Sequence, residues 1–466
     1  MKFLSFRNTV LPALLLSLMF VAASCKKDKT TTTPTASMPT IATNGLIINL
    51  TSTTAQSGGT ISDPGTSTVT ETGVVYSTTN KTPTTSDTKV VGTLVSSASA
   101  FPLDFSSDLT GLTANTTYYL RAYATNSSGT AYGSVVTFAT VSGSNGFTTA
   151  VTTFTGNGTQ GFANGISTAS MFNNPQGVSV DAAGNLYIAD TYNHLIRMAT
   201  ADGTTKTIAG DGTIGYTEGN ALTAQFYGPN GVVADAQGNL YVADLGNNVI
   251  RKITAAGVVS TFAGGGSAGY ANATGTSALF NNPSSLAIDG SGNIFVADFG
   301  NHVIRKITPA GVVTTLAGVH SPGFLNGTGS AAQFRNPHGI AIDATGNLFV
   351  ADQGNNAIRK VTPDGVVTTV AGGPSQPDLL NFPAGIALDK AGNIFVADEG
   401  GRILECTTSN VLLILAGGAN LTGFVNGDGT TARFNNPQAI AVDANNNIYV
   451  ADQNNNVIRK LVVTQK

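Results

Sequence analysis

The chain contains no tryptophan and only two cysteines, Cys25 and Cys406, among its 466 residues. The lack of tryptophan removes the largest ring available for stacking on a ligand. One pair of cysteines allows at most a single disulfide, and none if Cys25 carries a lipid. Stability must then come from packing and from pairing between strands. Cys406 lies between a glutamate and a threonine and is expected to be a small buried side chain.

Charged residues are also scarce, since Asp, Glu, Lys and Arg make up 11% of the chain and the formal net charge is -3. Two Gly-rich stretches, 157–172 and 265–280, contain no charged residue. Binding to phosphate groups needs a basic stripe, and the sequence contains none. We therefore expect no nucleic-acid partner.

The longest apolar stretch, Val10 to Ala23, is too short to span a bilayer comfortably and suits a secretory signal. Lys2 and Arg7 precede it, and the segment that ends at Cys25 resembles a bacterial lipobox. The resemblance implies a signal peptide at 1–24 and acylation of Cys25. We expect a protein of the bacterial cell envelope that is lipid-anchored at the outer membrane, on either its periplasmic or its surface side. The lipid is then the only membrane contact.

A repeat fills the C-terminal two thirds of the chain. Its six copies are marked by an aspartate at Asp190, Asp244, Asp298, Asp352, Asp398 and Asp452, so that the spacings are 54, 54, 54, 46 and 54 residues. Each copy alternates apolar and polar residues in four short runs, which is typical of half-buried strands. In the fourth copy these runs are Gly339 to Asp343, Leu348 to Asp352, Ala357 to Thr362 and Val366 to Ala371. A four-stranded repeat of about 50 residues predicts an all-β fold, a six-bladed β-propeller.

The two ends of the repeat region complement each other. The last copy stops after its third strand, whereas Ala150 to Gly156 matches the fourth-strand segment Val258 to Gly264 of an earlier copy. We therefore expect this N-terminal strand to complete the last blade and to remove the open edge of the ring.

The recurring motifs Pro-x-Gly-Ile-Ala-Val-Asp, Gly-Asn-Ile-Tyr-Val-Ala-Asp and Asn-Asn-Val-Ile-Arg-Lys resemble the NHL repeat, whose domains are six-bladed propellers. The resemblance covers residues 148–466. The fifth copy departs from it, because Glu405 and Cys406 stand at the positions of Arg and the residue after it, Arg402 stands where the others have Asn or His, and the preceding connection is eight residues shorter. This blade is either degenerate or specialised.

Two further segments precede the propeller. Residues 25–38 form a Thr/Pro-rich tether that is too poor in apolar residues to bury a core. Residues 39–141 read as short strands, and the stretch from Leu112 to Asn126 resembles the end of a fibronectin type III β-sandwich. There Tyr118 would be the tyrosine-corner residue, bonded back to the backbone. We expect this domain to be a spacer, followed by a linker at 142–147 that contains the hinge Ser142 to Gly146.

The long crossovers between blades are predicted to share one face with the loop between the second and third strands. Function belongs on this face, because the opposite face has only hairpin turns. In five crossovers a glycine precedes an aromatic residue: Phe162, Tyr216, Tyr270, Phe324 and Phe424. These rings are either packing caps for the loops or stacking surfaces for a glycan or peptide.

An arginine follows the marker aspartate by seven residues in five copies, as in Asp352 and Arg359. This spacing places opposite charges on neighbouring strands of one hairpin. A catalytic group is not needed so many times, and the pair predicts a structural salt bridge. The fifth copy needs another arrangement.

The residue after the first proline of each first strand is predicted to lie at the channel mouth, giving Gln176, Asn230, Ser284, His338, Ala384 and Gln438. This set holds one imidazole and no carboxylate, so we assign no catalytic residue, metal or cofactor. We expect a non-catalytic module that binds a protein or a glycan, with the five aromatic residues and Gln176, Asn230, His338 and Gln438 as binding residues. The alternative is a propeller enzyme of lactonase or lyase type, with its site around His338.

Overall fold

The computed structural model describes residues 36–95, 101–141, 147–374, 376 and 379–465. Within these ranges the regular structure consists of β-strands and 3-10 turns, without α-helix. None of the helical segments described is long and apolar enough to cross a membrane. The predicted signal peptide, Cys25, most of the tether and the hinge Ser142 to Gly146 lie outside the described residues.

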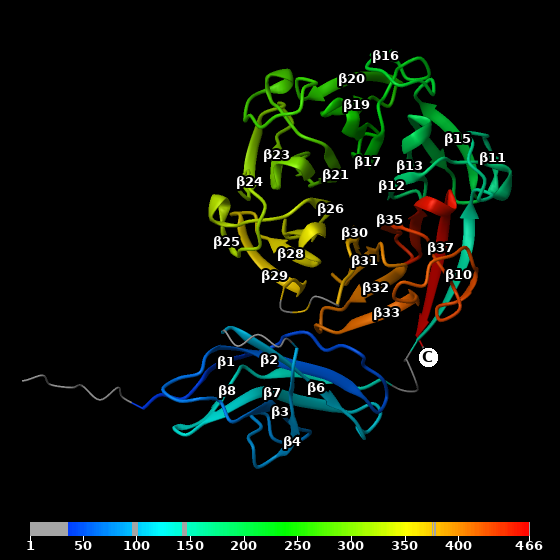
Figure 1. Cartoon of the computed structure of the whole chain (residues 1–466). Helices are drawn as coiled ribbons and strands as arrows, with labels where there is room; N and C mark the ends of the chain where they lie inside the picture. Colours follow the sequence, from blue (N-terminus) through cyan, green and yellow to red (C-terminus); the bar gives the residue numbers. More distant parts are fainter. Residues whose placement is uncertain (1–35, 96–100, 142–146, 375, 377–378, 466) are drawn as a thin grey trace, which may run out of the picture.

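The N-terminal region folds into two antiparallel sheets (Figure 1). The first has the order β1-β2-β6-β5, formed by β1 (Thr40–Thr43), β2 (Ala55–Asp63), β6 (Leu103–Leu109) and β5 (Thr93–Leu94). The second has the order β4-β3-β7-β8, formed by β4 (Thr88–Val91), β3 (Glu71–Ser77), β7 (Thr117–Asn126) and β8 (Gly129–Tyr132), and β9 (Val136–Ala139) also pairs with β7. We call this pair of sheets the sandwich.

Alternate residues of the strands form the core of the sandwich. In β7, Tyr118, Leu120 and Ala122 are buried, while the residues between them are more exposed. The Tyr118 hydroxyl accepts a hydrogen bond from the backbone N–H of Thr113 at 2.9 Å, which confirms the contact predicted for this residue. The assignment to fibronectin type III stays a prediction.

Six antiparallel sheets follow in the repeat region. In chain order of their first strands, innermost strand first, they are β12 (Pro175–Val180), β13 (Leu186–Asp190), β14 (Leu195–Ala199), β15 (Thr204–Ala209) and β11 (Gly165–Ile166); β17 (Pro229–Ala234), β18 (Leu240–Asp244), β19 (Val249–Ile253), β20 (Val258–Ala263) and β16 (Gly219–Asn220); β21 (Pro283–Ile288), β22 (Ile294–Asp298), β23 (Val303–Ile307) and β24 (Val313–Ala317); β26 (Pro337–Ile342), β27 (Leu348–Asp352), β28 (Ala357–Val361), β29 (Val366–Gly372) and β25 (Gly327–Thr328); β30 (Pro383–Leu388), β31 (Ile394–Asp398), β32 (Arg402–Cys406) and β33 (Leu412–Gly417); and β35 (Pro437–Val442), β36 (Ile448–Asp452), β37 (Val457–Gln465), β10 (Phe147–Thr155) and β34 (Gly427–Asp428).

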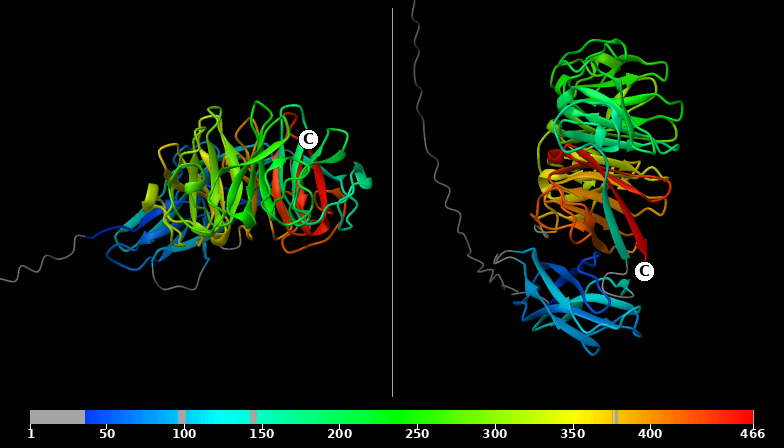
Figure 2. Two further views of the ribbon diagram at one scale, coloured as in Figure 1. Left: turned by 90° about the horizontal axis from the view of Figure 1, so that it is seen from above. Right: turned by 90° about the vertical axis from the view of Figure 1, so that its right-hand side faces the viewer.

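The sheets are arranged radially as in a β-propeller, and Figures 1 and 2 show them around one axis and from the side. The first strands of successive sheets contact one another, and β35 of the last sheet contacts β12 of the first. The glycine of the Pro-x-Gly motif permits this approach, because a Cβ atom at Gly339 would collide with the carbonyl oxygen of Ala384. Apolar residues between neighbouring sheets form the core, as where Phe334 packs with Val350 and Phe295.

The predicted pairing of the two ends of the repeat region is confirmed. β10 pairs antiparallel with β37 from Phe147 opposite Gln465 to Thr155 opposite Ile458. The last sheet thus takes its fourth strand from the start of the region, and β37 has a neighbour on both sides.

Short 3-10 turns occupy two recurrent places. After the second strand they are η2 (Thr191–Asn193), η3 (Leu245–Asn247), η5 (Phe299–Asn301), η7 (Gln353–Asn355) and η8 (Gln453–Asn455), and in the crossovers they are η1 (Ser167–Ala169), η4 (Gly275–Ser277) and η6 (Gly329–Ala331). Each turn after a second strand ends at a histidine or asparagine in the left-handed region, such as His302 or Asn356. The fifth sheet has no such turn.

Candidate binding site at the channel mouth

The first strands surround a channel of about 230 Å³. Of the predicted mouth residues, Gln176, Asn230, His338, Ala384 and Gln438 line it. Ser284 is fully buried, and its hydroxyl donates a hydrogen bond to the His338 carbonyl oxygen at 2.9 Å. The position after the first proline therefore brings together residues from separate repeats, as the sequence predicted.

Side-chain amides form two groups at this mouth. Asn230 Nδ2 donates to Gln176 Oε1 at 2.8 Å. In the second group, Gln438 Nε2 donates to Glu399 Oε1 at 2.8 Å, and Gln353 Nε2 donates to the same carboxylate oxygen. A carboxylate thus contacts the mouth residue Gln438 and accepts hydrogen bonds from the sheets on both sides of its own.

Glu399 corrects the sequence analysis, which expected no carboxylate here. The residue lies in the turn between β31 and β32, directly after the marker aspartate, and not in a first strand. Of the equivalent residues in other repeats, Phe299 contacts His338 and Gln353 donates to Glu399. Burial raises the pKa of Glu399, and the nearby charge of Asp398 acts in the same direction. Comparing the six residues that follow the marker aspartates would have singled out Glu399, because it is the one carboxylate among them.

His338 is buried in the channel wall. Its Nδ1 atom lies 3.3 Å from the Ala384 carbonyl oxygen, and its ring meets Phe299 edge-on at 5.9 Å between centroids. Burial lowers the pKa of His338 from 6.5 to about 4, because the imidazolium would lose its hydration. The imidazole is therefore uncharged at neutral pH.

This burial makes stability depend on pH. The folded-state pKa of His338 lies below the unfolded value, so the unfolded chain binds a proton first as the pH falls. The free energy of unfolding therefore decreases between pH 6.5 and about 4. We expect the wild-type free energy of unfolding to fall by about 3 kcal/mol more over this range than that of His338→Gln. Urea unfolding of both proteins across the range measures the difference. Parallel curves for the two proteins would contradict the pKa assigned to His338.

The five crossover aromatics do not join the mouth residues. Tyr216 stacks on the guanidinium of Arg251 in the third strand at 4.8 Å, and its hydroxyl lies 2.6 Å from the Thr261 hydroxyl in the fourth strand. Tyr270, Phe324 and Phe424 lie over Arg305, Arg359 and Arg459 in the same way. Phe162 differs, since it is 70% exposed. Arg197 lies over Phe172, a contact that the other four arginines make with the matching phenylalanines in addition to the crossover ring. Four rings therefore cover buried arginines over the outer strands, and a binding role for the set stays a prediction.

The predicted salt bridge is confirmed in five repeats. Arg359 Nη1 lies 2.8 Å from Asp352 Oδ2, and both side chains are fully buried. The remaining pairs of this kind are Arg197 with Asp190, Arg251 with Asp244, Arg305 with Asp298 and Arg459 with Asp452. Burial raises the pKa of Asp352 to about 6, which leaves the carboxylate largely ionised at neutral pH.

The arginine also holds the crossover in place. Arg359 Nη2 donates to the carbonyl oxygen of Leu325 at 2.9 Å and to Asn326 Oδ1 at 2.8 Å, and both partners lie in the crossover before the sheet. Three of the other arginines make the same two types of bond, and Arg251 makes the one to the carbonyl. The buried pair thus positions the crossover face rather than a reacting group.

The fifth repeat has a different register from the one that counting suggests. Asp398 pairs with Arg402, whereas Asp352 pairs with Ala357, so the turn is one residue shorter. Leu404 therefore occupies the arginine position, and Glu405 occupies that of Lys360, which corrects the assignment of Glu405 and Cys406. Arg402 provides the guanidinium for Asp398 from the start of β32. Cys406 is buried, as predicted.

The remaining histidines make structural contacts. His194 and His302 each accept a hydrogen bond at Nδ1, from the backbone N–H of Gly228 and of Asn336 respectively, and His320 stacks on Tyr270. Within the described ranges, no three His, Cys, Asp or Glu side chains are grouped so that they would hold a metal ion.

Comparison with known proteins agrees with this architecture. The NHL repeat family model matches residues 172–197, 226–253, 280–307, 334–361 and 434–461, which leaves out the divergent fifth repeat. NHL repeat-containing protein 2 of Bos taurus is 28% identical over 334 residues, which cover 64% of this chain and 40% of that protein. The chain spans less than half the length of the first curated relatives that it matches. The chain carries NHL repeats, and its repeat region is an NHL β-propeller.

Two solved structures share the fold over nearly the whole chain. A structural genomics protein of unknown function from Bacteroides thetaiotaomicron has a TM-score of 0.53 and 15% identity, and the match covers 92% of this chain and 98% of that one. An auxiliary nutrient binding protein from Bacteroides ovatus has a TM-score of 0.51 and 14% identity over 91% and 98%. The combination of an N-terminal β-domain with a propeller therefore occurs in other proteins.

Proposed function

We propose that this protein is a non-catalytic binding module whose six-bladed propeller takes a neutral, hydroxyl-rich ligand, such as a glycan, at the channel mouth on the crossover face. The observation that carries this proposal is the convergence of Glu399, Gln353 and Gln438 at the mouth, beside the pair Gln176 and Asn230. Amides both donate and accept hydrogen bonds, and a carboxylate accepts several, so the set suits hydroxyl groups. Among the described residues that line the channel there is no lysine or arginine to attract an anion.

The cell-envelope setting belongs to the same proposal. Its support is the sequence alone, in which Cys25 follows a short apolar stretch and a Thr/Pro-rich tether at 25–38 follows the cysteine. We place the acylated chain at the outer membrane, with the fibronectin type III-like domain at 39–141 and the linker at 142–147 between the lipid and the propeller at 148–466. The fold shared with a nutrient binding protein of Bacteroides ovatus agrees with a role in ligand capture.

The test uses the chain from residue 25 with Cys25→Ser, so that no lipid is attached. Neutral oligosaccharides from glucans, mannans and xylans are screened by calorimetry. For a ligand that binds, we expect the double variant Glu399→Ala, Gln438→Ala to lose at least about 10-fold in affinity, because a hydrogen bond to the charged Glu399 alone contributes about 1.5–3 kcal/mol.

Tyr216→Ala is the matched control for this test, since Tyr216 lies on the crossover face but over Arg251, away from the mouth. It should retain binding. Absence of any binding to these glycans, or equal affinity in the double variant, would sink the proposal for the mouth. A protein recovered from an envelope pull-down by the wild type and lost in the variant Tyr216→Ala would instead favour the protein partner and the aromatic set.

An enzyme of lactonase or lyase type is the second candidate. One observation favours it: His338 is uncharged at neutral pH and lines the same channel, so it has the protonation state of a general base. Turnover of a lactone that disappears in His338→Ala but persists in Tyr216→Ala would establish this candidate over simple binding.

A further inference from the structure

The outer strand of a sheet is normally covered by its own crossover. The two-residue strands β11, β16, β25 and β34 pair with the outer strands β15, β20, β29 and β10, and in the third sheet Thr274 bridges Val312. All these partners come from the crossover that precedes the sheet. An uncovered outer strand would leave its backbone N–H and C=O groups without partners.

The crossover of the fifth sheet is eight residues shorter than the others, and its described residues form no covering strand. Its outer-edge residue Val411 is bridged by Ile47, which lies in the connection between β1 and β2 of the sandwich. The Ile47 N–H donates to the Asn410 carbonyl oxygen at 2.8 Å, and the Leu412 N–H donates to the Ile47 carbonyl oxygen at 2.9 Å. Val411 stands at the same position as Val366, which pairs with Thr328 of the crossover strand β25 in the fourth sheet.

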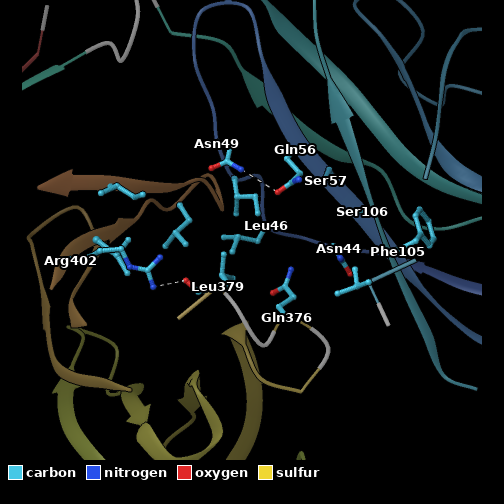
Figure 3. Close-up of a pocket in the computed structure, with 15 residues that line it drawn as sticks. Asn44, Leu46, Asn49, Gln56, Ser57, Phe105, Ser106, Gln376, Leu379 and Arg402 are labelled. Atoms are coloured by element: carbon cyan, nitrogen blue, oxygen red, sulfur yellow. Dashed lines mark hydrogen bonds between the residues drawn. The ribbon is translucent and has the colours of Figure 1, made fainter. Parts of the chain in front are cut away.

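Side chains cross the boundary in both directions. Leu46 packs in the apolar cluster of the fifth sheet with Leu380, Leu404 and Leu412. Val411 of the fifth sheet in turn packs in the apolar cluster of the sandwich, which contains Ile47 and Leu109. A cavity of about 290 Å³ remains between the two parts, lined by Leu46, Leu379, Leu404 and polar side chains such as Gln56 and Gln376 (Figure 3).

The substitution of arginine by Leu404 fits the loss of the crossover segment. In the fourth sheet Arg359 bonds Leu325 and Asn326, which directly precede β25. The fifth sheet lacks the corresponding residues, so an arginine at this position would be buried with too few acceptors, at a large cost in free energy. A leucine instead joins the apolar cluster beneath Leu46 and Leu412.

We infer that the sandwich replaces the missing crossover segment and completes the fifth sheet, so that the N-terminal domain is a structural part of the propeller rather than a spacer on a hinge. The fifth repeat is then specialised for docking and not degenerate. Its three departures, the shortened crossover, the leucine and the shorter turn, all occur in the sheet that meets the sandwich (Figure 1).

Hydrogen exchange on the chain from residue 25 with Cys25→Ser tests this inference. Leu46→Asp places a charge in the fifth-sheet cluster without altering the sandwich cluster. We expect the amides of β33 to exchange at least tenfold faster, while those of β29 and of β3 keep their protection. Val91→Asp, which makes the same charge change at a side chain that is 58% exposed in the sandwich, should leave all three strands unchanged.

A second variant, Ile47→Pro, removes the N–H that bonds Asn410. It should also expose β33, and protection of β3 reports whether the sandwich itself has unfolded. The inference is overturned if β33 remains protected in Leu46→Asp, or in Ile47→Pro with the sandwich intact.

Discussion

Replacing Arg359 by alanine is expected to lower the free energy of unfolding by about 3–5 kcal/mol, the range for breaking a buried ion pair from one side. The change leaves the fully buried Asp352 carboxylate without its cation. It also leaves the carbonyl oxygens of Gln333 and Leu325 and the side-chain oxygen of Asn326 without this donor. Urea denaturation followed by circular dichroism measures the loss.

Lys360→Ala is the matched control, since Lys360 is the next residue and its ammonium lies over the Phe349 ring at 5.8 Å in a half-buried setting. It should cost less than about 1 kcal/mol, as cation–π contacts at such sites do. The double variant Asp352→Leu, Arg359→Leu should be less destabilised than Arg359→Ala, because no charge is left unpaired. A loss in Arg359→Ala no larger than that in Lys360→Ala would show that the pair does not hold the crossover.

The repeat predicted the regular parts of the fold because strands and their turns are encoded locally. Leu348 to Asp352 was expected as a strand and is β27 without change of bounds. The other three runs of that repeat differ from β26, β28 and β29 by one or two residues at their ends. The pairing of β10 with β37 was also predictable, because the missing fourth strand left a visible gap at one end of the repeats.

The site was predictable only where it lies on strands of fixed register. His338 and Gln438 occupy the same position in the first strands of their own repeats, and both line the channel. Glu399 was missed because it belongs to a turn, whose side-chain direction does not follow from period-two alternation. The same turn shifted the fifth repeat by one residue, and Leu404 therefore took the arginine position.

The contact of Ile47 with Val411 had no signal in the sequence. It joins residues more than 300 positions apart and involves one bridge rather than a periodic pattern. The shortened spacing of 46 residues indicated that something differed in the fifth repeat. It did not indicate that another domain makes up the difference, and the expectation of a simple spacer followed from reading the two regions separately.

Linking the two ends of the propeller covalently is expected to raise the free energy of unfolding by about 2–5 kcal/mol, because a disulfide that closes a long loop reduces the entropy of the unfolded chain. Ala150 and Val462 are directly opposite each other in β10 and β37, and both are exposed. Opposite residues of an antiparallel pair have Cα atoms about 4.5–5.5 Å apart, within the range that a disulfide spans. The variant carries Ala150→Cys and Val462→Cys, with Cys25→Ser to prevent other pairings.

Thermal and urea unfolding of this variant with and without reductant isolates the crosslink, since both states have the same sequence. The matched control moves one cysteine out of register by combining Thr148→Cys with Val462→Cys, because Thr148 is opposite Thr464. We expect it to form little disulfide and to gain little stability. A crosslinked protein that unfolded at the same denaturant concentration as its reduced form would contradict the expected gain in stability.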